Sequence, residues 1–392
     1  MEKQEKISLS NSLILLLALT CGVVVANMYY IQPIGTKVAA SFSIDTGSIG
    51  ILTMLTQLGY ALGLLFLVPL GDVVDRPKLI IRMSALSALS LLAAFFAPSF
   101  LWFAAASFLI GLLSIVPQII IPYGAVLAGP EARGKTMGTL LSGLLIGILL
   151  SRTISGIVAS VINWRYMYFI ALCAVLLLTL MLVIKLPRVA SSKSPLSYTD
   201  SIKSLPYLVK TQRLLRDASI NGFFMFGSFS IFWSTLIFYI SSPVYGWGTF
   251  EAGILAIFGL VGAVAAPIVG RLADTYAERK IVLMGLAMQT ISFVLLFLGG
   301  GHLFVLLLAI ILLDIGNQFG QVANQTRVQG LGAETSNRNN TVFMFMYFIG
   351  GAAGSFFGTM MWQHFGWQGV TLLGLGFQAA AYFFYFVVFR KK

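Results

Sequence analysis

Runs of apolar residues recur along this chain, separated by short polar breaks. Each run approaches the length of about 20 residues at which an α-helix crosses the hydrocarbon core of a bilayer with its backbone hydrogen bonds satisfied internally. Six runs precede residue 187 and six follow residue 216, with approximate bounds 12–34, 47–70, 79–97, 100–128, 136–162, 166–186, 218–241, 250–271, 281–300, 303–328, 340–363 and 367–389. The pattern predicts an all-α membrane protein with twelve transmembrane helices.

The composition supports the same class. Of the 392 residues, 58% are hydrophobic and only 10% are charged, whereas a soluble domain carries about 25% charged residues. The formal net charge of +12 raises the question of nucleic-acid binding, but the basic residues form no single run. In a membrane protein they more readily mark cytoplasmic loops, so no nucleic-acid partner is expected.

The longest polar stretch divides the chain into two halves. We predict an N-terminal six-helix bundle over 1–187, a cytoplasmic linker over 188–216 and a C-terminal six-helix bundle over 217–392. With both termini cytoplasmic, most basic residues between the helices fall on the cytoplasmic side, as the positive-inside rule requires: Arg76, Lys78, Arg82, Arg133, Lys135, Arg271, Arg279, Lys280, Arg327 and Arg338. The bias suits a multi-pass protein of the cell membrane, most simply a bacterial inner membrane, although an organelle membrane stays open.

The two halves carry traces of an internal repeat. "PLGDVVDRPK" follows the second run and "VGRLADTYAERK" follows the eighth. Residues that align lie 202 or 203 positions apart: Asp72 and Asp274, Gln118 and Gln321, and Trp164 and Trp367. An even number of helices in each unit keeps the two halves in the same orientation, as in transporters built from parallel repeats.

These features together resemble the major facilitator superfamily over the whole chain. The loop after the eighth run carries the better match to the family signature, with Gly270, Leu272, Ala273, Asp274, Tyr276, Arg279 and Lys280. The loop after the second run keeps Leu70, Asp72 and Arg76 but departs at Val68, Val73 and Asp75. The nearest resemblance is to drug/proton antiporter-like exporters, although Ser151-Arg152 stands where those exporters often carry a Gly-Pro pair.

The resemblance implies a conformational latch at the two signature loops. Its members would be Asp72, Arg76, Gly270, Asp274, Arg279 and Arg338. Asp72 would lie at the N-terminus of the eleventh helix, near Arg338, where the helix dipole favours a carboxylate. Contacts that exist in one conformer only can bias a two-state equilibrium. The alternative is that both aspartates are solvated loop charges.

In this superfamily the first, fourth, seventh and tenth helices line a central cavity, and each carries polar residues on one face here. Polar groups within a membrane usually face protein or water. Together with a charge on the fifth helix, the candidate substrate-binding residues are Asn27, Tyr30, Gln118, Arg152, Trp233, Asp314, Gln318 and Gln321. For any single Asn or Gln, the alternative is an interhelical hydrogen bond without contact to a substrate.

Two of these candidates are charges inside the membrane. Arg152 lies near the middle of the fifth helix, and its counterpart in the repeat is Ser355, so the duplicated scaffold does not require it. We expect it to point into the cavity and to pair with Asp314 or with an anionic part of the substrate. A structural ion pair or a backbone-carbonyl clamp is the alternative. Asp314 could carry a coupling proton, because burial and a nearby arginine have opposite effects on the pKa of a carboxyl group.

The sequence therefore predicts a secondary active transporter that works by alternating access. Proton-coupled efflux of drug-like or metabolite-like compounds is the leading expectation, and a nutrient importer or an uncoupled facilitator is the alternative. We expect no enzymatic activity and no cofactor, since neither an HExxH nor a CxxC motif occurs and both histidines lie in outer loops. A non-transporting sensor on a transporter fold stays a third possibility. The expected partners are a small-molecule substrate, protons and the lipid bilayer, and the expected state is a monomer.

Overall fold

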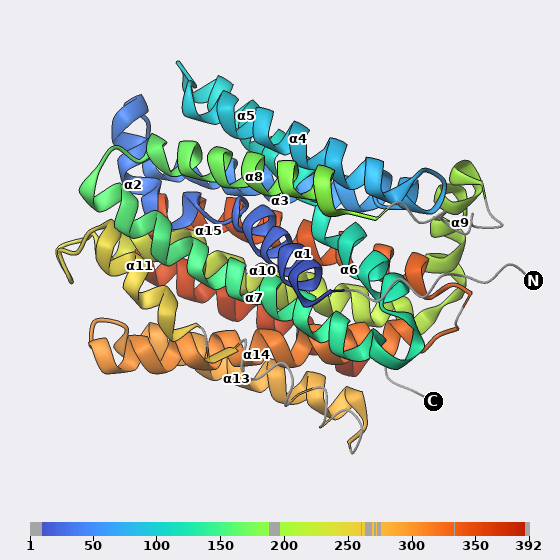
Figure 1. Cartoon of the computed structure of the whole chain (residues 1–392). Helices are drawn as coiled ribbons and strands as arrows, with labels where there is room; N and C mark the ends of the chain where they lie inside the picture. The colour runs from blue at the N-terminus through green and yellow to red at the C-terminus, as the bar shows by residue number, and fades with distance from the viewer. Residues whose placement is uncertain are drawn as a thin grey trace, which may run out of the picture.

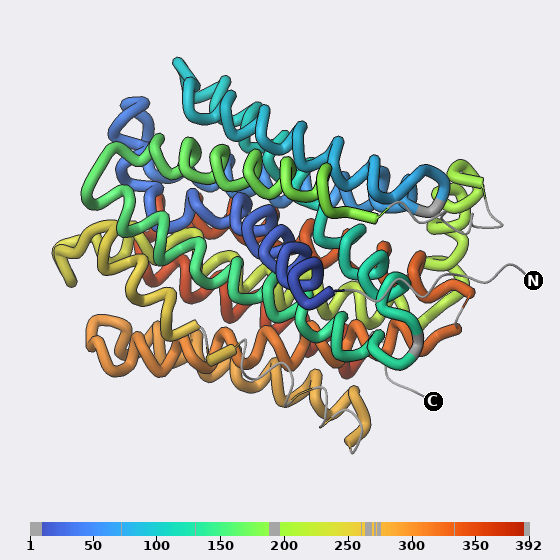
Figure 2. Tube along the Cα trace, in the orientation of Figure 1, coloured from blue at the N-terminus to red at the C-terminus, as the bar shows by residue number. Residues whose placement is uncertain are grey.

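The computed structural model describes residues 10–187, 197–259, 261–262, 269, 272, 276–332 and 334–388, without the side chains of Asp72, Pro130 and Val388. The described elements are helical throughout, which confirms the predicted all-α fold. Most helices run lengthwise between two ends of the molecule, and one short helix, α9, lies across one of these ends (Figures 1 and 2). We call this the α9 end, and we call the other the opposite end.

The first half contains eight α-helices and two short 3-10 turns. They are α1 (Asn11–Ala26), α2 (Ile31–Phe42), η1 (Thr46–Ser48), α3 (Ile49–Phe66), η2 (Pro69–Asp72), α4 (Arg76–Phe95), α5 (Phe100–Leu113), α6 (Val116–Leu127), α7 (Gly129–Val161) and α8 (Arg165–Lys185). The first predicted helix is divided into α1 and α2 at a turn over 27–30, and the fourth is divided into α5 and α6 at Ser114 and Ile115. Both divisions lie within a membrane-spanning segment, where interrupted helices often frame a binding site.

The second half begins with α9 (Tyr198–Thr211). It continues with α10 (Arg213–Ile240), α11 (Thr249–Phe258), α13 (Glu278–Gly299), α14 (Leu303–Gln329), α15 (Ser336–Phe383) and the π-helical turn η3 (Phe384–Val388). Within the described residues, ten helical segments are long and apolar enough to cross a membrane, and α11 is a shorter apolar helix. Helix α15 merges two helices at Gly366, whose φ of 57° breaks the helical path. These elements are consistent with the twelve predicted helices.

Rows of small residues pack helices together inside each half. A Cβ atom added to Gly147 of α7 would lie 2.2 Å from the carbonyl oxygen of Gly22 on α1. In the second half, a Cβ atom added to Gly354 of α15 would lie 2.0 Å from the carbonyl oxygen of Gly227 on α10. The fifth and eleventh helices therefore use their glycines for the same purpose, which is close backbone contact with the first helix of their own half.

The two halves meet tightly at the opposite end. The Thr153 hydroxyl of α7 donates a 2.8 Å hydrogen bond to the carbonyl oxygen of Gly253 on α11. A Cβ atom added to Gly156 would lie 2.3 Å from the carbonyl oxygen of Thr249. At Gly50 of α3, an added Cβ would lie 2.9 Å from the carbonyl oxygen of Ser355. Backbone at this distance leaves no passage between the halves at these points.

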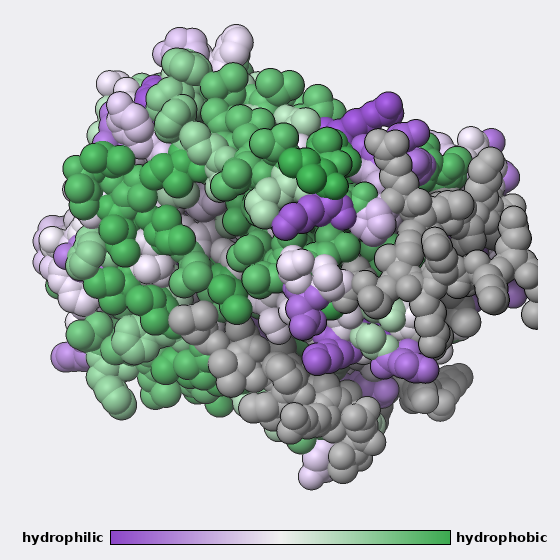
Figure 3. All heavy atoms as spheres, viewed as in Figure 1, coloured by the Kyte–Doolittle hydropathy of each residue, from purple (hydrophilic) through white to green (hydrophobic). Residues whose placement is uncertain are grey.

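The predicted linker contains helix α9, which contacts both halves. Its apolar side is fixed by Leu205 and Leu208, which are both buried. The Tyr198 hydroxyl donates a 2.9 Å hydrogen bond to the carbonyl oxygen of Phe66 at the end of α3. From the other half, Arg338 donates a 2.8 Å hydrogen bond to the Ser204 hydroxyl. In the face drawn in Figure 3, hydrophobic residues cover the middle of the molecule and strongly hydrophilic ones gather toward the α9 end.

Candidate functional site

Arg152 is the centre of a buried site between the two halves. Its side chain projects from α7 and is only 1% exposed. The Arg152 Nε atom donates a 2.6 Å hydrogen bond to Oε1 of Gln32 on α2. Gln32 is the second residue of α2, directly after the break between α1 and α2, so the interrupted first helix supplies the amide that orients the guanidinium.

Three aromatic rings surround the same guanidinium. The Arg152 Cζ atom lies 4.3 Å from the ring centroid of Trp233, 5.0 Å from that of Tyr29 and 5.7 Å from that of Phe229. Trp233 and Phe229 belong to α10 in the second half, whereas Tyr29 lies in the turn between α1 and α2. Cation–π attraction stabilises a guanidinium at such distances but satisfies none of its N–H groups.

Several buried polar atoms at this site lack hydrogen-bond partners among the described residues. They are Nη1 and Nη2 of Arg152, Oδ2 of Asp314 and Nε1 of Trp233. Buried polar groups in native proteins are nearly always paired, and an unpaired one is destabilising by about 1 to 3 kcal/mol. A gathering of such atoms around one guanidinium marks a place where a polar ligand group can bind.

Asp314 faces this site from α14 in the second half. It is 5% exposed, and its carboxyl group packs where α11 approaches, near Gly259 and Gly262. Its charge interacts with that of Arg152 through space. The two side chains form no ion pair within 4.0 Å in the described part of the chain. A direct pair with Asp314, one of the two partners expected for Arg152, is therefore absent among the described residues in this conformation, and Gln32 accepts the hydrogen bond of Nε instead.

A small cavity of about 10 Å³, about the space of one water molecule, lies at this site. Its lining comes from both halves and consists of Gln32, Pro33, Arg152, Trp233, Leu236, Ile237 and Ala252. Pockets for drug-sized ligands usually enclose about 300 to 1,000 Å³. In this conformation the site is therefore nearly closed, and a ligand enters only when the lining side chains move apart.

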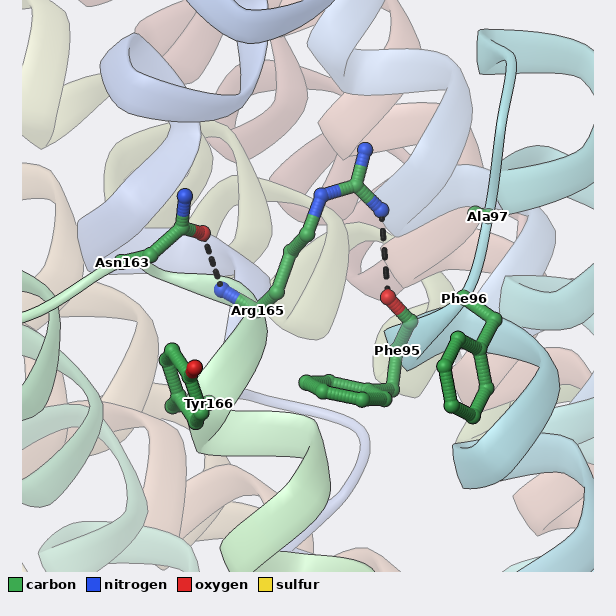
Figure 4. Close-up of a pocket in the computed structure, with 6 residues that line it drawn as sticks. All are labelled: Phe95, Phe96, Ala97, Asn163, Arg165 and Tyr166. Carbon is green, nitrogen blue, oxygen red and sulfur yellow. Dashed lines mark hydrogen bonds between the residues drawn. The ribbon is translucent and has the colours of Figure 1, made fainter.

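A larger, open hollow of about 370 Å³ lies elsewhere, at the opposite end of the first half. Figure 4 shows Arg165, from the start of α8, donating its 3.2 Å hydrogen bond to the carbonyl oxygen of Phe95. The remaining lining residues are Phe96, Ala97, Asn163 and Tyr166, all from the first half. Because this hollow does not lie between the halves, alternating access would not carry its contents across the membrane.

The other predicted site residues of the first half lie around this centre. Asn27 is buried at the helix break, and neither its amide nitrogen nor its amide oxygen has a partner among the described residues. The Tyr30 ring instead packs edge-on against Tyr168 of α8, with centroids 6.3 Å apart, inside the first half. The neighbouring Tyr29 takes the place beside Arg152. Gln118 donates a 3.0 Å hydrogen bond to the hydroxyl of Tyr60.

Asn317 and Gln321 of α14 form a second polar group with Tyr347, one to two turns from Asp314 toward the α9 end. The hydroxyl of Tyr347 on α15 donates a 3.2 Å hydrogen bond to Oε1 of Gln321 and accepts a 3.0 Å bond from Asn317. Its ring stacks on Phe226 at 4.0 Å. Gln318 is half-buried between Asp314 and this group. The structure thus brings Arg152, Trp233 and Asp314 together and places Gln318 and Gln321 next to them.

The predicted latch is only partly described. Gly270 and Asp274 lie outside the described residues, as does the side chain of Asp72. Arg76 donates a 2.8 Å hydrogen bond from Nε to the carbonyl oxygen of Gly71. Arg279 donates a 2.9 Å bond to the carbonyl oxygen of Tyr385. Arg338 binds α9, as described above.

The sequence did not single out every residue that the structure brings to these sites. Tyr29, Gln32 and Phe229 join the centre because the break after α1 changes which side chains face inward. The sequence signal that was available is Pro33, since a proline interrupts the regular hydrogen-bond ladder of a helix. A buried ion pair between Asp217 and Arg327 at the α9 end was also not foreseen. Within the part of the chain that is described, no group of three or more metal-ligating side chains occurs.

A charged and aromatic site between two bundles of membrane-spanning helices is the arrangement of a secondary transporter. The family model of the Major Facilitator Superfamily matches residues 17–354 and 254–392, so the chain belongs to that superfamily. The superfamily and the named relatives are transporters, which confirms the expectation of no enzymatic activity.

Similar proteins support this assignment. The chain is 36% identical over 366 residues to the uncharacterized transporter YgaY of Escherichia coli O157:H7, covering 93% of each chain. It is 30% identical over 374 residues to the protein named Probable transporter SCO4007 of Streptomyces coelicolor, covering 93% of this chain and 86% of the other. In fold it is similar to a bacterial homologue of the human lysosomal transporter Spinster in an inward-facing, unoccupied conformation, with a TM-score of 0.80, 15% identity and coverage of 99% and 98%.

Proposed function

We propose that this transporter binds its substrate at the Arg152 site and moves it by alternating access. The observation that carries the proposal is that one buried guanidinium from the first half is enclosed by Trp233 and Phe229 from the second half. Its two Nη atoms have no partner among the described residues. A ligand held there contacts both halves, so its binding can bias their relative arrangement.

The packing of the two halves is consistent with one state of such a cycle. Close backbone contacts at Gly50 and Gly156 shut the opposite end. At the α9 end, α9 bridges the halves, because Tyr198 binds the first half and Arg338 of the second half binds Ser204 of α9. We propose that the α9 end faces the cytoplasm, as the bias of basic residues implies. The chain would then lie in the cell membrane, as in a bacterial inner membrane, and act as a monomer.

Asp314 is the proposed proton carrier. It is the only carboxylate that lies at the Arg152 site in the described residues, and its Oδ2 atom has no partner there. A proton on Asp314 removes the negative charge that interacts with Arg152. Substrate binding and protonation are thereby linked, which is the requirement for coupling transport to a proton gradient.

Efflux of a drug-like or metabolite-like compound is the direction that the resemblance to exporters implies. Uptake is the second candidate, and one observation favours it. The place of the exporters' Gly-Pro pair holds Ser151-Arg152, and Arg152 is the centre of the site. The chemistry of this site is therefore not that of the exporter signature.

We further propose that the latch works through carbonyl contacts at the α9 end. Arg76 and Arg279 each hold a backbone carbonyl next to a signature loop. Each bond lies within one half, so it holds the signature loop in place on its own half, while Arg338 reaches α9.

Flux measurements test the proposed function. Purified protein in liposomes should move a substrate only when Arg152 is intact, and a pH gradient should change the rate. Comparing everted with right-side-out vesicles gives the direction. The substrate can be found beforehand by a ligand-stabilisation screen on the detergent-purified protein. Flux that is the same with and without a pH gradient would exclude proton coupling, and no gradient-dependent flux of any ligand would exclude transport.

A further inference from the structure

We infer that the substrate site is selective for organic monoanions, with Arg152 as the anchor for the anionic group and Asp314 as a competing negative charge. The inference rests on the proposed transport function and names the substrate class of the same site.

Arg152 forms no close ion pair with a carboxylate of the described residues. Its single hydrogen bond goes to a neutral amide, Gln32, and uses Nε alone. The two Nη atoms have neither a carbonyl nor a carboxylate oxygen within bonding distance among these residues, so the guanidinium is neither in a close ion pair nor in a carbonyl clamp. The two Nη atoms form the edge of the guanidinium fork that binds two oxygens of a carboxylate or sulfonate.

The surroundings also specify the body of the ligand. The cavity wall beyond the guanidinium consists of Trp233, Leu236, Ile237 and Ala252, and none of these side chains carries a charge. A flat or branched apolar group can pack there against the indole. The cavity of about 10 Å³ is nearly closed in this conformation, so these side chains move apart to admit the ligand.

Asp314 determines how many charges the site tolerates. When it is ionised, its field partly satisfies Arg152 and repels a second anion, because like charges at close range disfavour each other. When it is protonated, Arg152 needs an anion from elsewhere. Among the described residues, the charged or titratable groups that interact with Asp314 are Arg152 of α7 and Tyr347 of α15. Helix α10 contributes the neutral Trp233, and the described residues after α11 contribute Gly259 and Gly262.

Anion binding and protonation of Asp314 therefore favour one another. By reciprocity, an anion on Arg152 promotes protonation of Asp314 to the same degree that the proton promotes anion binding. A monoanion and one proton together leave the charge of the site unchanged. A dianion would leave one uncompensated negative charge in a buried place, which is unfavourable.

Calorimetric titration of the full-length protein in detergent tests the inference with probes of one size and different charge. The anions are benzoate and benzenesulfonate, the neutral analogue is benzamide, and the cation is benzylammonium. At least one anion should bind at least roughly tenfold more tightly than benzamide, which corresponds to about 1.4 kcal/mol. Equal or tighter binding of benzamide or benzylammonium, or no binding of either anion at millimolar concentration, would overturn the inference.

Substitutions identify the groups involved. Arg152→Gln should abolish the preference for the anion, and Arg152→Lys should retain only part of it because an ammonium lacks the fork. Arg165→Gln removes an arginine outside the site and serves as the matched control, with unchanged binding. If Arg152→Gln does not fold, Gln32→Glu gives a second test, because its carboxylate next to Arg152 should displace the anion. Unchanged anion affinity in the folded variant used would contradict the assignment.

The Asp314→Asn variant tests the competition separately. It should bind the anion several-fold more tightly than the unmodified protein at neutral pH, and its affinity should not change with pH. Weaker binding would mean that Asp314 assists the anion. Binding and flux test the two proposals separately. An anion that binds but is never transported contradicts the proposed function. Gradient-driven flux of a neutral compound that Arg152→Gln leaves unchanged contradicts the monoanion site.

Discussion

The Arg152 guanidinium lies 4.3 Å from the ring centroid of Trp233, and this contact joins the two halves of the transporter between two membrane-spanning helices. Arg152 belongs to α7 and Trp233 to α10, which no short loop connects. The contact is thus made only when the halves are correctly placed. Their relative position and the chemistry of the site are linked through one pair of side chains.

Removing the indole should therefore weaken substrate binding. A cation–π contact stabilises by about 0.5 to 2 kcal/mol, so Trp233→Leu should raise the KM of transport by roughly 2- to 30-fold, and Trp233→Phe should raise it less. Initial rates at varied substrate concentration measure this. Trp102→Leu removes an exposed indole on α5 and should leave the KM unchanged. An unaltered KM in Trp233→Leu would mean that the indole does not contact the substrate or its anchor.

The amide of Gln32 should fix the direction of the guanidinium. Gln32→Leu leaves Nε of Arg152 buried without a hydrogen bond, at a cost of about 1 to 3 kcal/mol in stability, and it frees the fork to rotate. We expect a lower melting temperature and a loss of discrimination between an anion and its neutral analogue. The matched variant is Gln289→Leu, which removes a buried 3.2 Å hydrogen bond to the carbonyl oxygen of Met225 outside the Arg152 contacts. It should lose stability without losing discrimination.

Much of this arrangement was predictable from the sequence, for physical reasons. Apolar runs of membrane-crossing length identify the helices, and the charges within them identify Arg152 and Asp314, because an intramembrane charge is costly enough to require a purpose. The predicted proximity of Trp233, Arg152 and Asp314 is seen in the structure.

It was harder to predict which side chains near the helix break face the site. A regular helix through residues 27–34 would place Tyr30 toward the cavity, but the turn before α2 directs its ring toward Tyr168. Tyr29 contacts Arg152 instead. A direct ion pair between Arg152 and Asp314 was expected because opposite charges attract. The distance between α7 and α14 is set by packing of the two halves, and no periodicity in one sequence encodes it.

Closure of the opposite end should depend on the absence of side chains at the seam. Gly156→Ala places a Cβ where the carbonyl oxygen of Thr249 lies at 2.3 Å, and a backbone atom cannot rotate away. The variant should favour conformers in which this end is open and should slow transport. Gly138→Ala, on the same helix with no atom within 4 Å of the added Cβ, is the matched control.

Spin labels at Asp45 and Ser241, which are exposed in different halves at the opposite end, can report this change. In a background without Cys21 and Cys173, pulsed electron resonance should give longer distances for Gly156→Ala and unchanged distances for Gly138→Ala. A distance distribution that does not move would show that the seam tolerates the methyl group.

The buried ion pair between Asp217 and Arg327 should be important for stability at the α9 end. Both side chains are less than a tenth exposed, and Arg327 also donates a 2.8 Å hydrogen bond to Asn324. Asp217→Asn leaves a buried cation unpaired, which is destabilising by about 3 to 5 kcal/mol. Lys78→Gln breaks an exposed pair with Asp75, which contributes at most about 1 kcal/mol. Thermal unfolding in detergent should separate the two, and the double variant Asp217→Asn with Arg327→Gln should recover part of the loss.

The sign of proton coupling follows from the charges at the central site. If a proton on Asp314 and a monoanion on Arg152 favour one another, both move in the same direction, and anion affinity rises as the pH falls through the titration of Asp314. Benzenesulfonate stays ionised at every pH of the experiment, so a change in its affinity with pH comes from titration of the protein alone. Proteoliposomes with an acidic exterior should accumulate it, and the accumulation should disappear when nigericin collapses the gradient. Asp314→Asn should still equilibrate the anion without concentrating it. Movement of the anion against the proton, toward the acidic side, would exclude co-binding and favour efflux by exchange.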